Sequence, residues 1–270
     1  MRLRARHLRL VVQGIFLIAF VALFWGLAWP QVPGRVASSL LALDPLTPVA
    51  TALADWTVPG WAWLGAAVLA GTAVLGRFFC GWVCPLGTLQ QLASWVAGPN
   101  RRSRAKLNRY RRWFALKYVV LVVLLVWAAL GTSHAGWLAP LSLLHRAVAS
   151  GLQPLWQGWA TPGGWVAFGL LAAIVLLSTW MPRFYCRALC PSGALMGVVA
   201  RVAPLRIRRG AGDCTGCTLC AMPCQGADEP LGDHRVSECH VCLNCLAVCK
   251  ETSLRWGLPK AGGVQPMPAL

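Results

Sequence analysis

The sequence predicts an α-helical membrane protein, with four transmembrane helices arranged as two hairpin repeats, followed by a small C-terminal α+β domain. Of the 270 residues, 57% are hydrophobic and only 12% are charged, which is too apolar for an ordinary soluble domain. The net charge of +17 is unevenly placed, because residues 1–210 hold 21 of the 25 basic residues but two of the eight acidic ones. Eight of the 12 cysteines lie within residues 214–249, so the chain divides into a basic, apolar body and an acidic, cysteine-rich end.

Four apolar runs are long enough to cross a bilayer core of about 30 Å, which takes about 20 helical residues. They cover approximately residues 9–29, 61–79, 115–133 and 164–182. The first follows the basic start MRLRAR and resembles a secretion signal. Its apolar stretch is longer than the ~7–15 residues of such a segment, and no small-residue cleavage site follows directly. We therefore expect an uncleaved membrane anchor.

The basic residues predict the orientation of these spans. Arginine and lysine crowd at the N-terminus, after the second span and after the fourth, whereas residues 30–60 and 134–163 contain only Arg35 and Arg146. Cytoplasmic loops carry such an excess, so both termini and the C-terminal domain are expected on the cytoplasmic side of a bacterial inner membrane. Because the arginines flank apolar spans, they indicate contact with lipid headgroups and not with nucleic acid.

The two outer loops contain apolar stretches that are typical of interfacial or re-entrant helices, ASSLLALDPLTPVATALA and GWLAPLSLLHRAVASGL. Each stretch contains the same short pattern of proline, leucine and a hydroxyl residue, which is Pro45-Leu46-Thr47 in the first and Pro140-Leu141-Ser142 in the second. Chance similarity stays open for so short a match. No quinone-binding motif is readable in these loops, and their polar residues are weak candidates for such a site: Asp44, His134, His145 and Arg146.

A longer repeat lies at the ends of the second and fourth spans. RFFCGWVCPLGTL at 77–89 and RFYCRALCPSGAL at 183–195 are identical at seven of 13 positions. Proline after the second cysteine favours the first turn of a new helix, so Cys84 and Cys190 are expected to cap helices whose dipoles favour a thiolate. Both spans run in the same direction, so the four cysteines could face one another and bind a further metal or cluster, cycle between dithiol and disulfide, or be structural. They are Cys80, Cys84, Cys186 and Cys190.

The C-terminal cysteines form two runs, CTGCTLCAMPC at 214–224 and CHVCLNCLAVC at 239–249. Their shared spacing, C-x2-C-x2-C-x3-C, resembles that of bacterial two-cluster ferredoxins. By that resemblance, one 4Fe-4S cluster is bound by Cys214, Cys217, Cys220 and Cys249. The second 4Fe-4S cluster is bound by Cys239, Cys242, Cys245 and Cys224. The proline that usually follows the fourth cysteine is replaced by Gln225 and Lys250.

Other uses of these cysteines are disfavoured. Disulfides rarely persist in the reducing cytoplasm, and structural zinc usually takes two C-x2-C pairs separated by a longer gap. The expected organisation is a membrane domain at 1–204, a two-cluster ferredoxin-like domain at 205–256 with short strands from 205–213 and 250–256, and a disordered tail at 257–270. The clusters add negative charge, so this domain should dock against the arginine-rich cytoplasmic surface.

The whole motif set resembles the NapH-type membrane ferredoxins, which are quinol dehydrogenase subunits associated with periplasmic nitrate reductase. They belong to a wider superfamily of polytopic 4Fe-4S proteins with two CxxxCP motifs, and the resemblance covers about residues 1–256. It implies an electron-transfer subunit, not a self-contained enzyme, that passes electrons from membrane quinol to a partner of an anaerobic respiratory chain. A second iron–sulfur subunit or a cytochrome is the expected partner.

A function of another class stays open. Accessory proteins of cbb3-type oxidase assembly belong to the same superfamily, so the chain could instead reduce or deliver a metal such as copper during maturation of a metalloenzyme. The four CxxxCP cysteines would then be the working site. A redox sensor is disfavoured because no output or DNA-binding segment is present, and no c-haem motif, P-loop or dinucleotide fingerprint occurs.

Overall fold

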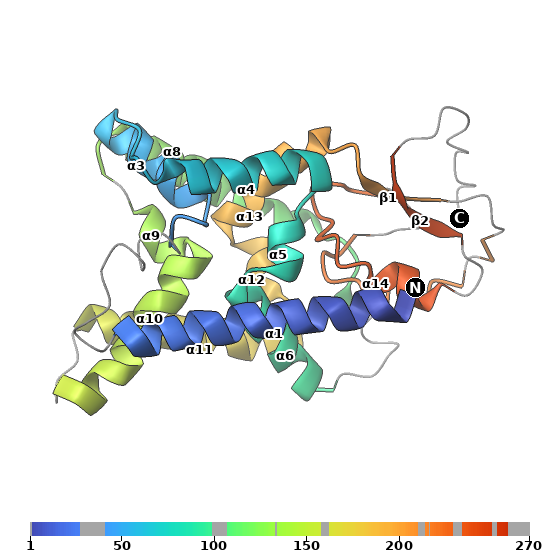
Figure 1. The fold of residues 1–270 in the computed structure, drawn as a ribbon, viewed down its shortest axis with the longest axis horizontal. Helices are drawn as coiled ribbons and strands as arrows, with labels where there is room; N and C mark the ends of the chain where they lie inside the picture. Colours follow the sequence, from blue (N-terminus) through green and yellow to red (C-terminus); the bar gives the residue numbers. More distant parts are fainter. Residues whose placement is uncertain are drawn as a thin grey trace.

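The computed structural model describes residues 2–27, 41–98, 107–132, 134–157, 162–209, 214–215, 217–228, 234–249 and 253–258. The longer helices are α1 (Arg2–Leu27), α3 (Leu46–Asp55), α4 (Ala62–Leu75), α6 (Pro85–Val96), α8 (Leu116–Ala129), α10 (Pro140–Gln157), α11 (Pro162–Trp180) and α13 (Pro191–Val199). The short elements are α5 (Phe78–Trp82), η1 (Arg112–Ala115), α9 (Ala135–Leu138), α12 (Phe184–Ala188), η2 (Ala200–Val202), β1 (Arg206–Arg209), α14 (Asn244–Val248) and β2 (Leu254–Gly257). Figure 1 shows α3 and α9 at one end of an elongated helical body and β1, β2 and α14 at the other.

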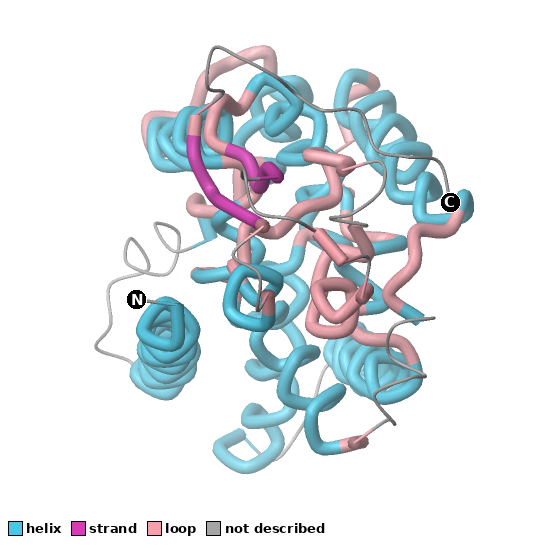
Figure 2. The backbone as a smooth tube through the Cα atoms, turned by 90° about the vertical axis from the view of Figure 1, so that its right-hand side faces the viewer, coloured by secondary structure: helices cyan, strands magenta, loops and turns pink. Residues whose placement is uncertain are grey.

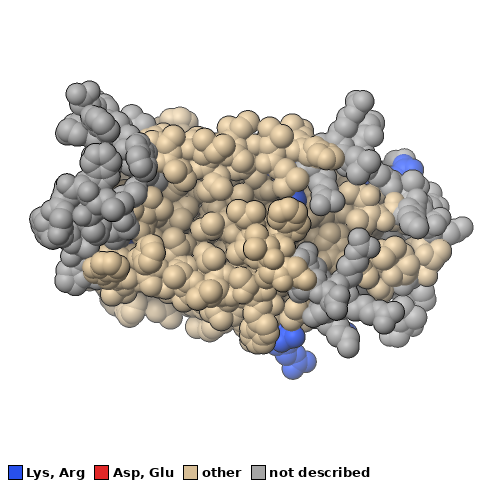
Figure 3. Space-filling view, turned by 90° about the horizontal axis from the view of Figure 1, so that it is seen from below, with Lys and Arg blue, Asp and Glu red and all other residues tan. Residues whose placement is uncertain are grey.

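Two stretches of this body, Arg112–Ala129 and Gly163–Trp180, are long and apolar enough to cross a membrane. Only 28% and 22% of their residues are buried, so most of their apolar side chains face outward, unlike those of a soluble core helix. The apolar helices His7–Leu23 and Ala62–Leu75 are shorter. The prediction of a helical body is confirmed, and two of the four predicted spans meet the length for crossing. Figure 3 shows one face of this body, on which few charged side chains appear among the described residues.

The second predicted span, 61–79, is wrong in length, because α4 ends at Leu75. Gly76 follows with φ of +79°, and its N–H donates to the carbonyl oxygen of Thr72 at 2.9 Å. Glycine adopts this left-handed region at no steric cost, which is why it commonly ends helices. The chain then turns at Arg77 and begins the separate short helix α5.

The prolines of the two cysteine strings begin helices, as predicted. α6 begins at Pro85 and α13 at Pro191, and the preceding cysteines take extended N-cap conformations with ψ of 114° at Cys84 and 110° at Cys190. Proline suits this first helical position, because its missing N–H would have no helical partner there. The repeated sequence therefore folds into the same local structure twice, a short helix followed by a cysteine-capped helix.

Both outer loops form helices, as predicted, and these helices fold back against the body. α3 packs on α8, and α10 packs on α11. Leu46 is fully buried and Leu141 is 3% exposed, and the Tyr185 hydroxyl donates a hydrogen bond to the carbonyl oxygen of Leu138. The segments around Pro45-Leu46-Thr47 and Pro140-Leu141-Ser142 therefore reach the interior near the two cysteine strings.

The two predicted flanking strands are also confirmed. β1 and β2 pair antiparallel, with Ile207 opposite Trp256 and Arg209 opposite Leu254. Figure 2 shows this strand pair in front of helices that are seen along their axes. Ile207 and Leu254 bury their side chains against Cys220 and Cys245, so the strands cover the cysteine-rich loops. The predicted tail lies outside the described residues beyond Leu258.

Candidate functional site

The C-terminal cysteines lie in two groups. In the first group, burial and the neighbouring thiols of Cys214, Cys217 and Cys249 raise the pKa of Cys220 to about 11. Cys217 is exposed, whereas Cys214 and Cys249 are partly buried. The residues predicted to share the first cluster are therefore brought together at a solvent-accessible position.

The second group lines a cavity. Its walls are Ile207, Cys224, Gly226, Asp228, Cys239, His240, Cys242, Leu243 and Cys245. Burial and the nearby Cys242 thiol raise the pKa of Cys224 to about 12, and burial raises that of Cys239 well above its usual value. Because thiols must lose their protons to bind a metal, binding of a cluster by these cysteines would release protons. The four cysteines predicted for the second cluster thus face one cavity.

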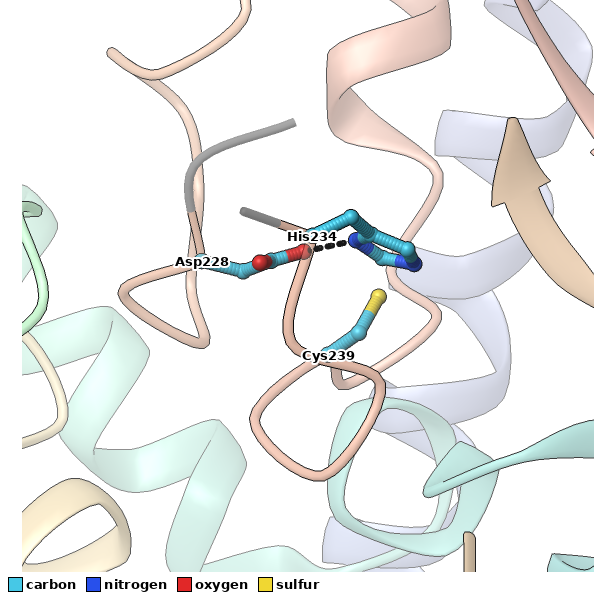
Figure 4. Close-up of side chains that lie close together, drawn as sticks. All are labelled: Asp228, His234 and Cys239. Carbon is cyan, nitrogen blue, oxygen red and sulfur yellow. Dashed lines mark hydrogen bonds and ion pairs between the residues drawn. The ribbon is translucent and has the colours of Figure 1, made fainter. Parts of the chain in front are cut away.

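A hydrogen-bonded pair holds the cavity together (Figure 4). A carboxylate oxygen of Asp228 contacts Nδ1 of His234, and its other oxygen accepts a hydrogen bond from the backbone N–H of Arg235 at 2.8 Å. The Cys239 sulfur lies within 4.8 Å of both side chains. Only three ligand atoms meet here, and Cys239 also faces the cavity of the second group. We therefore interpret Asp228 and His234 as a structural hydrogen-bonded pair that keeps the loop after Cys224 beside Cys239.

The first cysteine string docks directly onto the segment that carries this second group. Nη1 of Arg77 donates to the carbonyl oxygen of Ser237 at 2.7 Å. Nε1 of Trp82 donates to the carbonyl oxygen of Val241 at 2.9 Å. These two contacts lie on either side of Cys239 in the sequence, so the helical body binds the loop that carries this predicted cluster ligand.

The second string makes matching contacts. Nη1 of Arg183 lies 3.3 Å from Nδ1 of His240. Nε of Arg187 donates to the carbonyl oxygen of Gln225 at 3.0 Å, and its Nη2 donates to that of Cys224 at 3.0 Å. Both strings thus contact the loops of the second group.

Buried positive charge gathers where the two cysteine strings contact residues 224–241, a region called the junction below. Burial lowers the pKa of His240 well below its usual value, and four nearby cations lower it further. They are Arg77, Arg183, Lys117 and Arg187, each at most 1% exposed. Glu238 contacts Lys117 Nζ, lies 3.5 Å from Arg77 Nη1 and accepts a hydrogen bond from the Tyr118 hydroxyl at 3.3 Å. Buried charges require compensation, so an anionic cluster beside these cations would stabilise the junction.

These polar residues were not predicted from the sequence as part of the site. The arginine-rich surface was expected to meet the cysteine domain, but the arginines that do so were not predicted individually. A usable signal was present, because arginine precedes the first cysteine by three positions in both strings, at Arg77 and Arg183. No comparable signal pointed to Glu238 or Lys117, because their contact joins residues 121 positions apart.

The junction requires a glycine. A Cβ atom added to Gly81 would lie 2.2 Å from the carbonyl oxygen of His240, a distance that real Cβ atoms essentially never show. Gly81 lies between Cys80 and Trp82 on the short helix α5. The close approach of the two backbones therefore depends on the missing side chain.

Replacing Gly81 with alanine is therefore expected to loosen the junction and to destabilise the protein by about 1–3 kcal/mol, the usual cost of overpacking. The measurement is thermal unfolding of the full chain in detergent, together with protease cleavage of the C-terminal region. Gly169→Ala is the matched control, since a Cβ at Gly169 would meet nothing within 4 Å. Equal unfolding temperatures and equal cleavage for the two variants would contradict the assignment.

The four CxxxCP cysteines are all buried, with exposed fractions of 7% for Cys80, 5% for Cys84, 5% for Cys186 and 4% for Cys190, and Cys80, Cys84 and Cys190 lie in one hydrophobic core. Burial raises the pKa of the Cys190 thiol, and the thiols of Cys186 and Cys80 raise it further. The same two neighbours act on Cys84. Thiols from both repeats therefore lie near one another, as the parallel direction of the two spans predicts.

Comparison with known families agrees with the duplication. A family model described as a 4Fe-4S binding domain matches twice, at residues 57–104 and 163–210. Each match contains one cysteine string, so the predicted repeat is confirmed. With the tandem cysteine runs, these matches define the class, a ferredoxin-type iron–sulfur protein of electron transport.

The full-length relatives define the family more closely. The chain is 31% identical to the ferredoxin-type protein NapH of Escherichia coli (strain K12), over 90% of this chain and 86% of the relative. It is 31% identical to the ferredoxin-type protein NapH of Haemophilus influenzae, over 77% of this chain and 72% of the relative. The chain therefore belongs to the family of NapH-type ferredoxin proteins.

The chain is also similar to parts of larger proteins. The chain is 30% identical to the regulatory protein NosR of Pseudomonas aeruginosa, over 62% of this chain but only 23% of that relative. It thus spans about a quarter of NosR, and half of a putative electron transport protein, YccM, of Escherichia coli. No solved structure matches the chain.

Proposed function

We propose that this protein is a membrane-bound electron-transfer subunit that passes electrons from membrane quinol to a redox partner of an anaerobic respiratory chain. The observation that carries the proposal is the direct contact between the helical body and the cysteine-lined cavity. Arg77 and Trp82 of one repeat and Arg183 and Arg187 of the other all bond to residues 224–241. A body that only anchored a ferredoxin domain would not need to bring both repeats to one set of ligands.

Two 4Fe-4S clusters are the proposed carriers, and they supply one-electron transfer when bound. Cys224, Cys239, Cys242 and Cys245 would hold an inner cluster beside the helical body. Cys214, Cys217, Cys220 and Cys249 would hold an outer cluster. Because Cys217 is exposed, the outer cluster is the one that a partner could approach. The partner is proposed to be a second iron–sulfur subunit or a cytochrome.

The proposed setting is the bacterial inner membrane, with residues 1–204 as the membrane domain and residues 205–256 as a cytoplasmic domain. Four helices would cross the bilayer, with α1 and α4 completing the set formed by the two longer apolar stretches. The basic loops support this orientation, since cytoplasmic segments carry the excess of arginine and lysine. Lipid would contact the outward-facing apolar side chains and give quinol access to the body.

Quinol oxidation provides the test of this proposal. Each quinol yields two electrons and two protons on becoming quinone, and iron–sulfur clusters accept the electrons one at a time. We expect a reduced menaquinol analogue, added without oxygen to the protein in lipid nanodiscs, to bleach the iron–sulfur absorbance. A quinone analogue should restore the absorbance of protein reduced beforehand.

The control is a Cys242→Ser variant, in which removal of one inner ligand should leave roughly half of the ferredoxin-type iron and slow the bleaching of what remains. Persistence of the wild-type absorbance after quinol, with no recovery after quinone, would overturn quinol as the electron source. Unchanged iron content in Cys242→Ser would overturn the ligand assignment.

A further inference from the structure

The geometry points to a third iron–sulfur cluster, bound in the helical body by Cys80, Cys84, Cys186 and Cys190 and balanced in charge by Arg77 and Arg183. This site lies beyond the two ferredoxin-type clusters of the proposed function. Each segment matched by the 4Fe-4S family model contains only two of these cysteines. A cluster with four thiolate ligands therefore requires both segments, which gives the duplication a chemical purpose.

The surroundings of the sulfurs contain hydrogen-bond donors. The backbone N–H of Gly193 donates to the Cys190 sulfur at 3.3 Å, and Nε2 of Gln90 donates to the Cys186 sulfur at 3.3 Å. The Oε1 atom of Gln90 accepts a hydrogen bond from the Ser178 hydroxyl at 3.2 Å, which fixes the amide orientation. Such donors to sulfur favour the thiolate form and tune the potential of an iron–sulfur centre.

Helix ends add positive charge beside two of the sulfurs. Cys84 is the N-cap of α6 and Cys190 is the N-cap of α13, so each thiol lies at the positive end of a helix dipole. A thiolate is stabilised at that position. Cys84 and Cys190 occupy the same place in the two repeats, so the two helices direct their N-termini at the same core.

The two arginines cross between the repeats. A Cβ atom added to Gly193 of the second string would lie 2.7 Å from Nη2 of Arg77, which belongs to the first string. A Cβ atom added to Gly87 of the first string would lie 3.7 Å from Nη1 of Arg183, which belongs to the second. Each arginine therefore approaches the turn that follows the other repeat's cysteine pair.

These arginines are not fully satisfied by the residues that the structure describes. Nε and Nη2 of Arg77 and Nε of Arg183 are buried without a hydrogen-bond partner. Burying such charged donors costs free energy unless an anion compensates them. Nη2 of Arg77 lies beside the Cys190 turn, so an anion bound to the four thiols would be close to it.

The charges also match. An oxidised 4Fe-4S cluster with four thiolates carries about two negative charges. Lys117, Arg77 and Arg183 carry three positive charges here, and Glu238, which pairs with both Lys117 and Arg77, carries one negative charge, so these four side chains leave two positive charges. Asp44 is a negatively charged neighbour of Cys84 and Cys190 just before α3, and its carboxylate accepts a hydrogen bond from Leu46 N at 3.2 Å.

Counting iron and acid-labile sulfide tests this inference. Full-length protein purified without oxygen should contain about twelve of each, against about eight if it holds only the two ferredoxin-type clusters. The Cys80→Ser, Cys186→Ser double variant should fall to about eight while keeping the electron paramagnetic resonance signals of the other two clusters. Cys217→Ser is the matched control, because it should lose the outer cluster and keep the third signal.

Arg77→Gln gives a second readout that a purely structural role would not move. Removing a positive charge disfavours the reduced, more negative cluster, so the midpoint potential of the third signal should fall. The exposed Arg111→Gln control should leave that potential unchanged.

A count of eight in the wild-type protein would overturn the inference. So would stoichiometric copper or zinc at the four cysteines, or a disulfide between them in the protein as isolated. If the double variant does not accumulate, the wild-type count decides. None of these measurements depends on quinol, so this inference and the proposed electron source can fail separately.

Discussion

Replacing Arg187 with methionine is expected to destabilise the junction by about 3–5 kcal/mol, because its guanidinium satisfies several acceptors and each buried acceptor left without a donor costs about 1–3 kcal/mol. The Arg187 side chain is 1% exposed. Its guanidinium donates to the carbonyl oxygens of Gln225 at 3.0 Å, Cys224 at 3.0 Å and Leu107 at 3.3 Å, and to Oδ1 of Asn108 at 2.8 Å. Methionine fills a similar volume without any of these donors, so two buried and two partly buried acceptors would lose a partner.

The loss should reach the proposed inner cluster, because one of these acceptors belongs to Cys224 itself. We expect a lower unfolding temperature in detergent and roughly half the iron of the ferredoxin-type clusters after gel filtration. Arg111→Met is the matched control, since Arg111 is exposed. The unfolding temperature and iron content of Arg187→Lys should lie between those of Arg187→Met and Arg111→Met. Lysine keeps the positive charge but lacks the planar set of N–H donors that arginine has. Full iron content and wild-type stability in Arg187→Met would contradict this account of the junction.

Local sequence rules predicted much of the fold. Proline after cysteine predicted the starts of α6 and α13, and apolar patterning predicted helices in the outer loops. The segments beside the cysteine runs were predicted to form strands, and β1 and β2 lie there. Each of these features depends on neighbouring residues, so a single sequence contains the necessary information. The length predicted for the second span was wrong, because hydropathy along the sequence does not detect the helix end at Gly76.

The junction could be predicted only in outline. Charge complementarity predicted that the basic body would meet the cysteine-rich end, and the contacts of Arg77 and Arg187 agree. The sequence could not show that each repeat's arginine reaches the turn of the other repeat. That arrangement depends on how the two hairpins pack, and the paired positions are far apart in the chain. The need for glycine at position 81 could not be predicted either, because the atom that a side chain would meet is the carbonyl oxygen of His240, 159 positions away.

Glu238 is the acidic partner that joins the two parts of the protein at this junction, and its removal is expected to have an effect as large as the loss of Arg187. Glu238→Gln leaves Lys117 and Arg77 buried without a carboxylate, although Arg77 keeps its hydrogen bond to Ser237. Removing one partner of a buried pair costs about 3–5 kcal/mol, most of which is the penalty of the charge left behind.

The double variant Glu238→Gln, Lys117→Met is expected to be more stable than the sum of the two single losses predicts. If the cost comes from the uncompensated lysine, removing that charge as well should recover much of the stability, with a coupling energy of about 1–3 kcal/mol. Thermal unfolding of the wild type, both single variants and the double variant in detergent measures this cycle. Additive losses would instead mean that Glu238 acts mainly through Arg77 or Tyr118, and a Glu238→Gln, Tyr118→Phe cycle would separate those two partners. Recovery in the lysine cycle alone would establish the Lys117–Glu238 pair as the charged link between α8 and the loop that carries Cys239.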